Sequence, residues 1–312
     1  MIPATPDEFA RQRALDSYRV LDTLPEQAYD DIVQLAATLC GAPIALVSLI
    51  DRDRQWAKAK IGMDATDVAR DMAFCDHAIR EPHQLLEVPD TMRDARFSDN
   101  PFVALGDGVR FYAGMPLVTP AGAPIGTVCV ADSVPRRLND AQRAALAALS
   151  RLTINLLEGH ARERAHERAT TLVAAPMPAE VAGGTPGYTV VIVELQGYAE
   201  LVIRTGGRIS ERLLDQLDAT LDACIRHDAG DVLNRATGSA ECIAVLQGDA
   251  VESQVEAIRR SCETFSRDHG VLVLIASATS DTPGEAPERV FLRADEALSM
   301  EKDRLARQAQ AA

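Results

Sequence analysis

Hydrophobic and polar positions form two blocks along the chain, and each block mixes helical and strand-like periods. In the first block, apolar residues at helical spacing precede short, strongly apolar runs of the kind that form buried strands. The expected elements are helices over 7–21, around 32–39, over 75–79 and from residue 140, with strands over 44–50, 55–61, 111–119 and 123–131. This order predicts an antiparallel sheet with helices on one side, which is an α+β domain.

The second block begins near residue 188 and arranges the same mixture in a different order. Its expected strands cover 188–195, 231–235, 242–246 and 271–278, and its expected helices cover 210–226, 251–265 and 288–307. Apolar residues of the middle helix recur in steps of four and three, which predicts a one-sided core stripe. The order βαββαβα predicts a ferredoxin-like sandwich with an antiparallel hairpin at its centre.

Chain length and the composition between the blocks set the domain boundaries. A chain of 312 residues is long enough for two cores. The prolines and glycines between 176 and 187 predict a linker. We therefore expect a first domain over 1–157, a helical extension and linker over 158–187, and a second domain over 188–312.

The helix that begins near Asp140 carries a short heptad-like seam. Its members are Ala145, Leu149, Leu152 and Leu156. Such a seam has two uses that the sequence leaves open: packing on its own domain, or pairing with a second copy of the chain. The second use predicts a homodimer.

Charge and composition exclude several partner classes. A formal net charge of -14 argues against a nucleic-acid surface, which needs clustered Lys and Arg. The sequence has neither a signal peptide nor a run of about 20 apolar residues, so no membrane partner is expected. The six cysteines are spread without a Cys-x-x-Cys pair. This favours reduced, buried thiols and a cytoplasmic location.

Motif patterns alone reveal no active site. The sequence contains no nucleophile elbow, phosphate-binding loop, zincin helix or cluster of metal ligands. The six histidines are scattered, and none forms a spaced pair with cysteines.

Six short stretches, in order, resemble the GAF domain found at the N-terminus of bacterial signalling proteins. They cover residues 18–23, 43–51, 53–56, 74–79, 111–117 and 126–132. The resemblance extends from residue 7 to about 157 and implies a sheet whose covering loops enclose a pocket for a small molecule. The pocket residues that it implies are Trp56, Cys75, His77, Phe111 and Cys129. It does not identify the ligand.

Cys75 has three candidate roles. Light-sensing relatives attach a bilin through a cysteine directly followed by histidine, whereas Asp76 separates Cys75 from His77 here. A redox-sensing thiol would have Cys129 or Cys40 nearby, and a cysteine near a histidine can have a lowered pKa. The third role is that of a buried thiol in the pocket wall.

The second block resembles the GGDEF family, the fold of diguanylate cyclases. These enzymes make cyclic di-GMP from two GTP molecules with two divalent metal ions. Residues 293–302 match the family's closing Ala-Asp-x-Ala-Leu-Tyr-x-Ala-Lys motif in phase, with Ser299 in place of tyrosine. The order of elements agrees throughout.

The match fails at the positions that the resemblance assigns to catalysis. The Gly-Gly-Asp-Glu-Phe signature aligns with Gly238, Ser239, Ala240, Glu241 and Cys242. Glu194 and Glu241 are the residual carboxylates at metal-binding positions, Gln196 replaces the second acidic residue, and Val202 and Glu211 replace the guanine-reading Asn and Asp. Two metal ions beside a triphosphate need close-set carboxylates, and valine has no hydrogen-bonding group for guanine. These losses together predict an inactive domain, to which we assign no metal or cofactor.

The combined expectation is a cytoplasmic signalling protein. Its GAF domain binds a small molecule or a partner and controls the inactive GGDEF-like domain, which would contact another signalling protein. Two alternatives stay open. One is an active or weakly active diguanylate cyclase, and the other is a redox-sensing or methionine sulfoxide reductase-type GAF protein.

Overall fold

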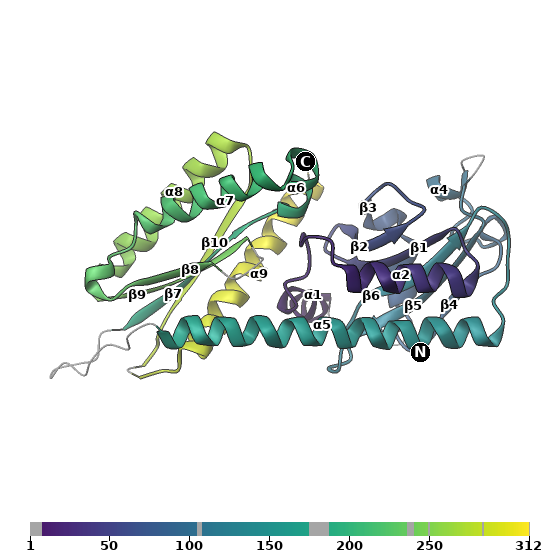
Figure 1. Cartoon of the computed structure of the whole chain (residues 1–312), viewed down its shortest axis with the longest axis horizontal. Helices are drawn as coiled ribbons and strands as arrows, with labels where there is room; N and C mark the ends of the chain where they lie inside the picture. The colour runs from purple at the N-terminus through teal and green to yellow at the C-terminus, as the bar shows by residue number, and fades with distance from the viewer. Residues whose placement is uncertain are drawn as a thin grey trace. The chain divides into compact units, whose positions relative to one another are not determined.

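The chain folds into two compact units, and the division falls inside a long helix after Ala161 (Figure 1). The computed structural model describes residues 8–104, 108–174, 187–235, 240–248, 250–282 and 284–311. Each unit combines helices with an antiparallel sheet, which confirms the α+β fold. Most of the Pro/Gly linker expected before residue 188 lies outside the described residues.

The first sheet has six strands in the order β3-β2-β1-β6-β5-β4, and all neighbours are antiparallel. The strands are β1 (Ile44–Ile50), β2 (Arg54–Ile61), β3 (Asp67–Ala69), β4 (Leu86–Val88), β5 (Phe111–Val118) and β6 (Pro124–Asp132). The sequence pattern missed β3 and β4, because three residues are too few to show a period of two.

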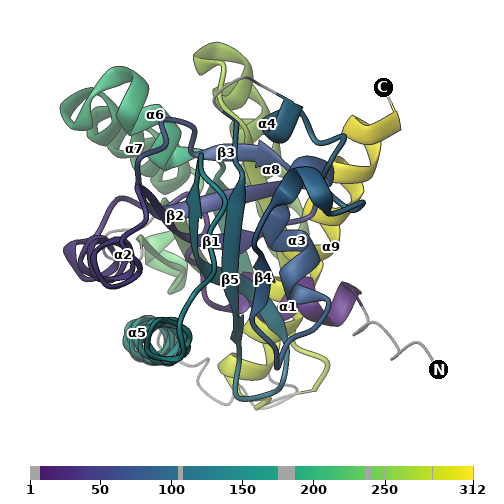
Figure 2. The same cartoon turned by 90° about the vertical axis from the view of Figure 1, so that its right-hand side faces the viewer.

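Helices cover both faces of this sheet, whereas the sequence predicted them on one side. They are α1 (Glu8–Ser17), α2 (Gln27–Cys40), α3 (Phe74–Ile79), α4 (Pro101–Ala104) and α5 (Asp140–Ala174), with 3-10 turns η1 (Arg70–Met72) and η2 (Thr91–Arg93). Figure 2 shows α2 and α5 on one side of the sheet and α3 on the other. A separate apolar core forms on each side. Helix α1 ends earlier than predicted, and Arg19 beyond it has a φ of 48°, which a continuing helix cannot adopt.

The predicted seam of α5 does not form one continuous face. Leu149 is buried in the core beside α2, and Leu156 packs partly against the same core. The side of the helix that carries Leu152 points outward, with 52% of that residue exposed. Packing on its own domain therefore accounts for Leu149, and Leu152 is the seam residue that stays open to solvent.

The second unit has a four-stranded antiparallel sheet in the order β10-β7-β9-β8. Its elements are β7 (Tyr188–Leu195), α6 (Tyr198–Thr205), α7 (Gly207–Asp222), η3 (His227–Ala229), β8 (Val232–Arg235), β9 (Glu241–Gln247), α8 (Val251–His269), β10 (Val273–Thr279) and α9 (Pro287–Ala311). The sequence pattern missed α6, which Gly206 separates from α7 with a φ of 86°.

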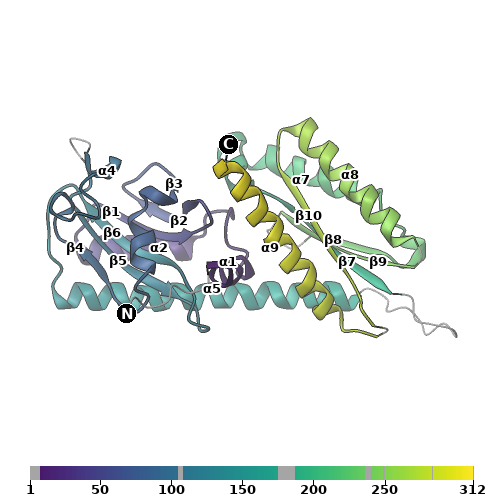
Figure 3. The ribbon, with the colours of Figure 1, turned by 180° about the vertical axis from the view of Figure 1, so that it is seen from behind.

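The second sheet also separates two cores. Residues of α6, α7 and α8 pack on one face, and Val290, Ala294 and Leu298 of α9 pack on the other. Figure 3 shows α9, in yellow, running across its face of the sheet. Strand residues therefore face α9 or the other three helices in alternation.

Candidate functional site

A small cavity of about 70 Å³ lies on the α3 side of the first sheet. Its wall is mostly apolar, and the thiols of Cys75 on α3 and Cys129 on β6 belong to it. Gln55 and Tyr112 contribute the other polar groups of the wall. A typical ligand pocket has roughly 300–1,000 Å³, so this cavity is smaller than most ligand sites.

Three of the five predicted pocket residues lie elsewhere. Trp56 and Phe111 are buried in the core on the α2 side of the sheet. Their chain neighbours Gln55 and Tyr112 line the cavity instead, because consecutive strand residues point to opposite faces. The third residue, His77, is half-buried beside the aromatic cluster under α3.

His77 lies two positions after Cys75, and a nearby histidine can lower the pKa of a cysteine. Its ring instead packs edge-on against Phe97, with 4.8 Å between the ring centroids. Burial and the nearby Arg80 guanidinium lower the pKa of His77, so the imidazole is held toward its neutral form. The groups that contact the Cys75 thiol come from the sheet.

The two cavity thiols lie in direct contact. The Sγ atoms of Cys75 and Cys129 are 3.7 Å apart, and the Tyr112 hydroxyl donates a hydrogen bond to Cys75 Sγ at 3.3 Å. The hydroxyls of Ser48 and Thr127, 3.0 Å from each other, belong to the same buried polar group. Sequence reasoning paired Cys75 with Cys129 or Cys40, and the structure brings it to Cys129.

The two thiols differ in acidity. Burial opposes ionisation of Cys75, but hydrogen bonds from Cys129, Ser48, Thr127 and Tyr112 outweigh it and lower the pKa of Cys75. The neighbouring Cys75 and burial both raise the pKa of Cys129 well above its usual value. One thiol of the pair is therefore predisposed to be the thiolate and the other to stay protonated.

Two glycines make this arrangement possible. A Cβ on Gly114 would lie 2.2 Å from the Tyr112 hydroxyl, so only glycine leaves room for the tyrosine in its observed position. A Cβ on Gly126 would lie 2.0 Å from the Ser48 carbonyl oxygen, where β1 and β6 approach closely. Neither glycine was singled out in the sequence as a pocket residue.

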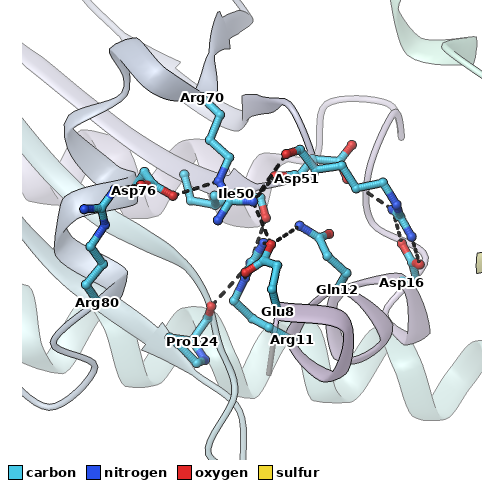
Figure 4. A network of polar contacts seen from close by, with 11 residues as sticks. Glu8, Arg11, Gln12, Asp16, Ile50, Asp51, Arg70, Asp76, Arg80 and Pro124 are labelled. Carbon is cyan, nitrogen blue, oxygen red and sulfur yellow. Dashed lines mark hydrogen bonds and ion pairs between the residues drawn. The ribbon is translucent and has the colours of Figure 1, made fainter. Parts of the chain in front are cut away.

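Charged residues connect α3 to α1 in a continuous network (Figure 4). Arg70 donates to Glu8 at 2.6 Å and to Asp76 at 2.7 Å, and Arg80 contacts Asp76 at 2.6 Å. Burial alone would raise the pKa values of Glu8 and Asp76, but hydrogen bonds from the arginines lower both. Asp76 directly follows Cys75, so the network ends beside the thiol pair.

Two further arginines fasten α1 to the β1–β2 region. Arg11 is 2% exposed and donates to the Ile50 carbonyl oxygen and to Glu8, both at 2.8 Å. Arg52 binds both carboxylate oxygens of Asp16, at 2.6 and 3.1 Å. Such charge-assisted, bidentate hydrogen bonds fix geometry as well as contributing energy. Helix α1 is thus held by charge pairing as well as by its apolar face.

In the second unit, the residual carboxylates Glu194 and Glu241 stand directly opposite each other on β7 and β9. Their register places both on the α9 face of the sheet. Glu194 Oε1 accepts hydrogen bonds from Lys302 Nζ at 2.7 Å and from the Gln196 amide at 2.6 Å. A divalent cation at Glu194 would have to displace that ammonium group. With Gln196 and Ala240 at two of the acidic positions, the residues present do not fit the two-metal site that the GGDEF resemblance implies.

The guanine-reading positions lie on the opposite face of the sheet. Val202 of α6 packs against the core there. Glu211 of α7 forms an ion pair with Arg235 at 3.2 Å, and Arg235 also contacts Asp218 at 2.8 Å. Glu211 is thus held in an acidic cluster around one arginine.

The remaining signature positions are only partly visible. Ala240 is buried at the start of the β9 region, whereas Gly238 and Ser239 lie outside the described residues. Across the described part of the chain, no group of three or more His, Cys, Asp or Glu side chains is placed to hold a metal ion. Within the same residues, no helix has the length and apolar character that crossing a bilayer requires.

Comparison with known proteins assigns the first unit. The family model of the GAF domain matches residues 24–155, which confirms the GAF assignment. A cyclic di-GMP phosphodiesterase of Pseudomonas aeruginosa is 39% identical over 134 residues, which are 43% of this chain and 23% of that protein. The chain thus spans about a quarter of the length of this curated relative.

Solved structures of both predicted domain types share local similarity with the chain. The GAF domain of a phosphoenolpyruvate-protein phosphotransferase from Acinetobacter is 12% identical, with 49% of this chain and 95% of that chain covered and a TM-score of 0.37. The GGDEF domain of DgcB from Caulobacter crescentus, in complex with c-di-GMP, is 15% identical, with 38% and 72% covered and a TM-score of 0.33.

Proposed function

We propose that this chain is a cytoplasmic regulatory protein of cyclic di-GMP signalling, with a GAF sensor and a catalytically inactive GGDEF-type output domain. In this proposal the GAF domain responds to a small molecule at the cavity beside Cys75. The second unit, with its ferredoxin-like order of elements, contacts another signalling protein instead of turning over GTP. A homodimer formed through α5 is part of the proposal.

The observation that carries the inactive output domain is the loss of acidic and guanine-reading residues at Gln196, Ala240 and Val202. A cyclase needs free carboxylates to hold two cations beside the triphosphate. Here Lys302 neutralises one of the two residual carboxylates, and the other, Glu241, is 3% exposed. The guanine-reading position is an apolar Val202. The site therefore lacks some of the carboxylates that metal binding needs and the group that would recognise the base.

Turnover of GTP tests this half of the proposal. The purified full chain is incubated with GTP and Mg²⁺ or Mn²⁺, next to an active diguanylate cyclase as the control. We expect no cyclic di-GMP from this protein. Sustained product formation by the wild-type chain would refute the inactive output domain.

Native mass spectrometry tests the sensor half. We expect a small molecule to co-purify with the chain or to bind from a metabolite mixture, and a dimer to be present. The variant Ala131→Leu, which places extra carbons in the cavity wall, should abolish that binding. The matched control Ala219→Leu alters α7 in the second unit and should leave it unchanged. A ligand that binds both variants equally would place sensing elsewhere.

A further inference from the structure

The most unusual chemistry in the described chain is a pair of cysteines buried together without a disulfide. Cys75 and Cys129 are 2% and 1% exposed, and their Sγ atoms are 3.7 Å apart. They come from different elements, 54 positions apart in the sequence, so the contact is a product of the fold. A disulfide bond is about 2.05 Å long, so the two sulfur atoms would have to approach each other by roughly 1.7 Å.

Polar groups surround this pair on the sheet side. Tyr112 donates to Cys75 at 3.3 Å, and the Ser48 and Thr127 hydroxyls are additional hydrogen-bonding groups. Apolar burial alone would keep both thiols protonated and inert. Three hydroxyls around a single sulfur instead stabilise a thiolate on Cys75, while Cys129 retains its proton.

The cavity supplies access for a small oxidant. Both thiols belong to its wall, and its volume of about 70 Å³ exceeds the share of one water molecule, about 30 Å³. Hydrogen peroxide is little larger than water, whereas disulfide reagents and glutathione are far larger than the cavity. The cavity therefore has room for a small peroxide beside both thiols.

We propose that Cys75 and Cys129 form a peroxide-reactive dithiol that closes to a disulfide inside the GAF domain. The Cys75 thiolate attacks one peroxide oxygen, an S–O bond forms, the O–O bond breaks, and the leaving hydroxide takes the proton that Cys75 lost on ionising, which makes one water. Cys129 sulfur then attacks Cys75 sulfur, and the S–O bond breaks. The departing hydroxide takes the Cys129 proton as a second water. The two thiols lose two electrons in total, and the peroxide gains them.

This modification goes beyond the proposed function, because it requires neither the small ligand nor the second unit. It also suggests where oxidation would act. Cys75 lies in α3 next to Asp76, whose carboxylate connects through Arg70 to Glu8 on α1. Pulling Cys75 toward β6 would disturb that ion-pair network.

Peptide mapping of the full-length protein tests the proposal without any mutation. After treatment with hydrogen peroxide and blocking of the remaining thiols, trypsin should release Cys75 within residues 71–80 and Cys129 within residues 111–136, each the single cysteine of its peptide. We expect these two peptides to be cross-linked, with a mass lower by two hydrogens, and a reductant to separate them. A map in which both cysteines remain alkylated, or in which Cys75 pairs with another cysteine, would overturn the proposal.

Variants separate the two steps. Cys129→Ser should stop the reaction at Cys75 carrying one added oxygen, and Cys75→Ser should leave Cys129 unoxidised. The control Cys40→Ser removes another buried thiol of the same domain, whose pKa burial raises, and should oxidise like wild type. Tyr112→Phe should slow the reaction about two- to tenfold, the factor equivalent to one lost hydrogen bond. An unchanged rate in that variant would refute the role of the hydroxyl.

Discussion

Substituting Gly114 tests whether the packing around Tyr112 is as tight as the structure implies. A Cβ at this position would lie 2.2 Å from the Tyr112 hydroxyl oxygen and 2.8 Å from the ring carbon that carries it. The tyrosine would have to shift and weaken its hydrogen bond to Cys75. Overpacking of a close-packed core costs about 1–3 kcal/mol. We therefore expect Gly114→Ala to lower the free energy of unfolding of the first unit by that amount.

The single tryptophan makes this measurement specific. Trp56 is buried in the core of the first unit, so its fluorescence follows unfolding of that unit within the full chain. For a unit of about 150 residues, each kcal/mol lowers Tm by roughly 2–4 °C. The variant Tyr112→Phe removes the atom nearest to the new Cβ. Gly114→Ala should then be less destabilising in the Tyr112→Phe background than in wild type.

Gly159 supplies a matched control with the opposite sign. It lies within α5, and a Cβ there meets no atom within 4 Å. Gly159→Ala should stabilise the first unit by about 0.5–1 kcal/mol through helix propensity. If Gly114→Ala proved as stable as wild type, or if its cost were the same in the Tyr112→Phe background, the described packing of Tyr112 would be refuted.

Three further predictions concern the charge network, the second unit and α5. The lowered pKa values of Glu8 and Asp76 mean that their ion pairs stabilise the fold above the unfolded pKa of about 4 and are lost as pH falls through the folded values. Glu8→Gln should therefore reduce the loss of Tm between pH 7 and pH 3, and an unaltered acid profile would contradict this. Lys302→Met should destabilise the second unit by about 1–3 kcal/mol, because Glu194 loses its counter-ion, and thermal unfolding followed by circular dichroism measures this loss. Adding Glu194→Gln should restore most of the lost stability, and no restoration would argue against the ion pair. Leu152→Glu should turn a dimer into a monomer in sedimentation, because the side chain is exposed on the single chain and would be charged in the interface. A persisting dimer would remove α5 from the interface.

The sequence allowed most long elements to be predicted, because their apolar periods are regular. The run over 44–50 became β1, and the stripe over 251–265 became part of α8. The three-residue strands β3 and β4 were missed because they are shorter than the pattern needed to detect them. Helix α6 was missed as well. Gly206 ends it at Thr205, and the stretch before the predicted helix at residue 210 looked like an irregular connection.

The candidate site was harder to predict than the fold, because the face of the sheet to which a strand residue points depends on the exact register. Trp56 and Phe111 are aromatic residues on the correct strands, but they lie one position away from the residues that face the cavity. The contact between Cys75 and Cys129 likewise follows from how α3 packs on β6, which spacing along the chain does not encode. The Lys302–Glu194 pair joins the last helix to the first strand of the second unit. The sequence identified both residues without relating them.

The most direct test of the central claim is the amount of cyclic di-GMP that the purified full chain makes from GTP. Mass spectrometry of the quenched reaction measures the product, with Mg²⁺ and Mn²⁺ in parallel and an active diguanylate cyclase as the positive control. The account predicts no product above the protein-free background, because Gln196 and Ala240 replace acidic residues and Val202 cannot recognise guanine. Product that rises in proportion to protein concentration and disappears on Glu241→Gln would contradict it.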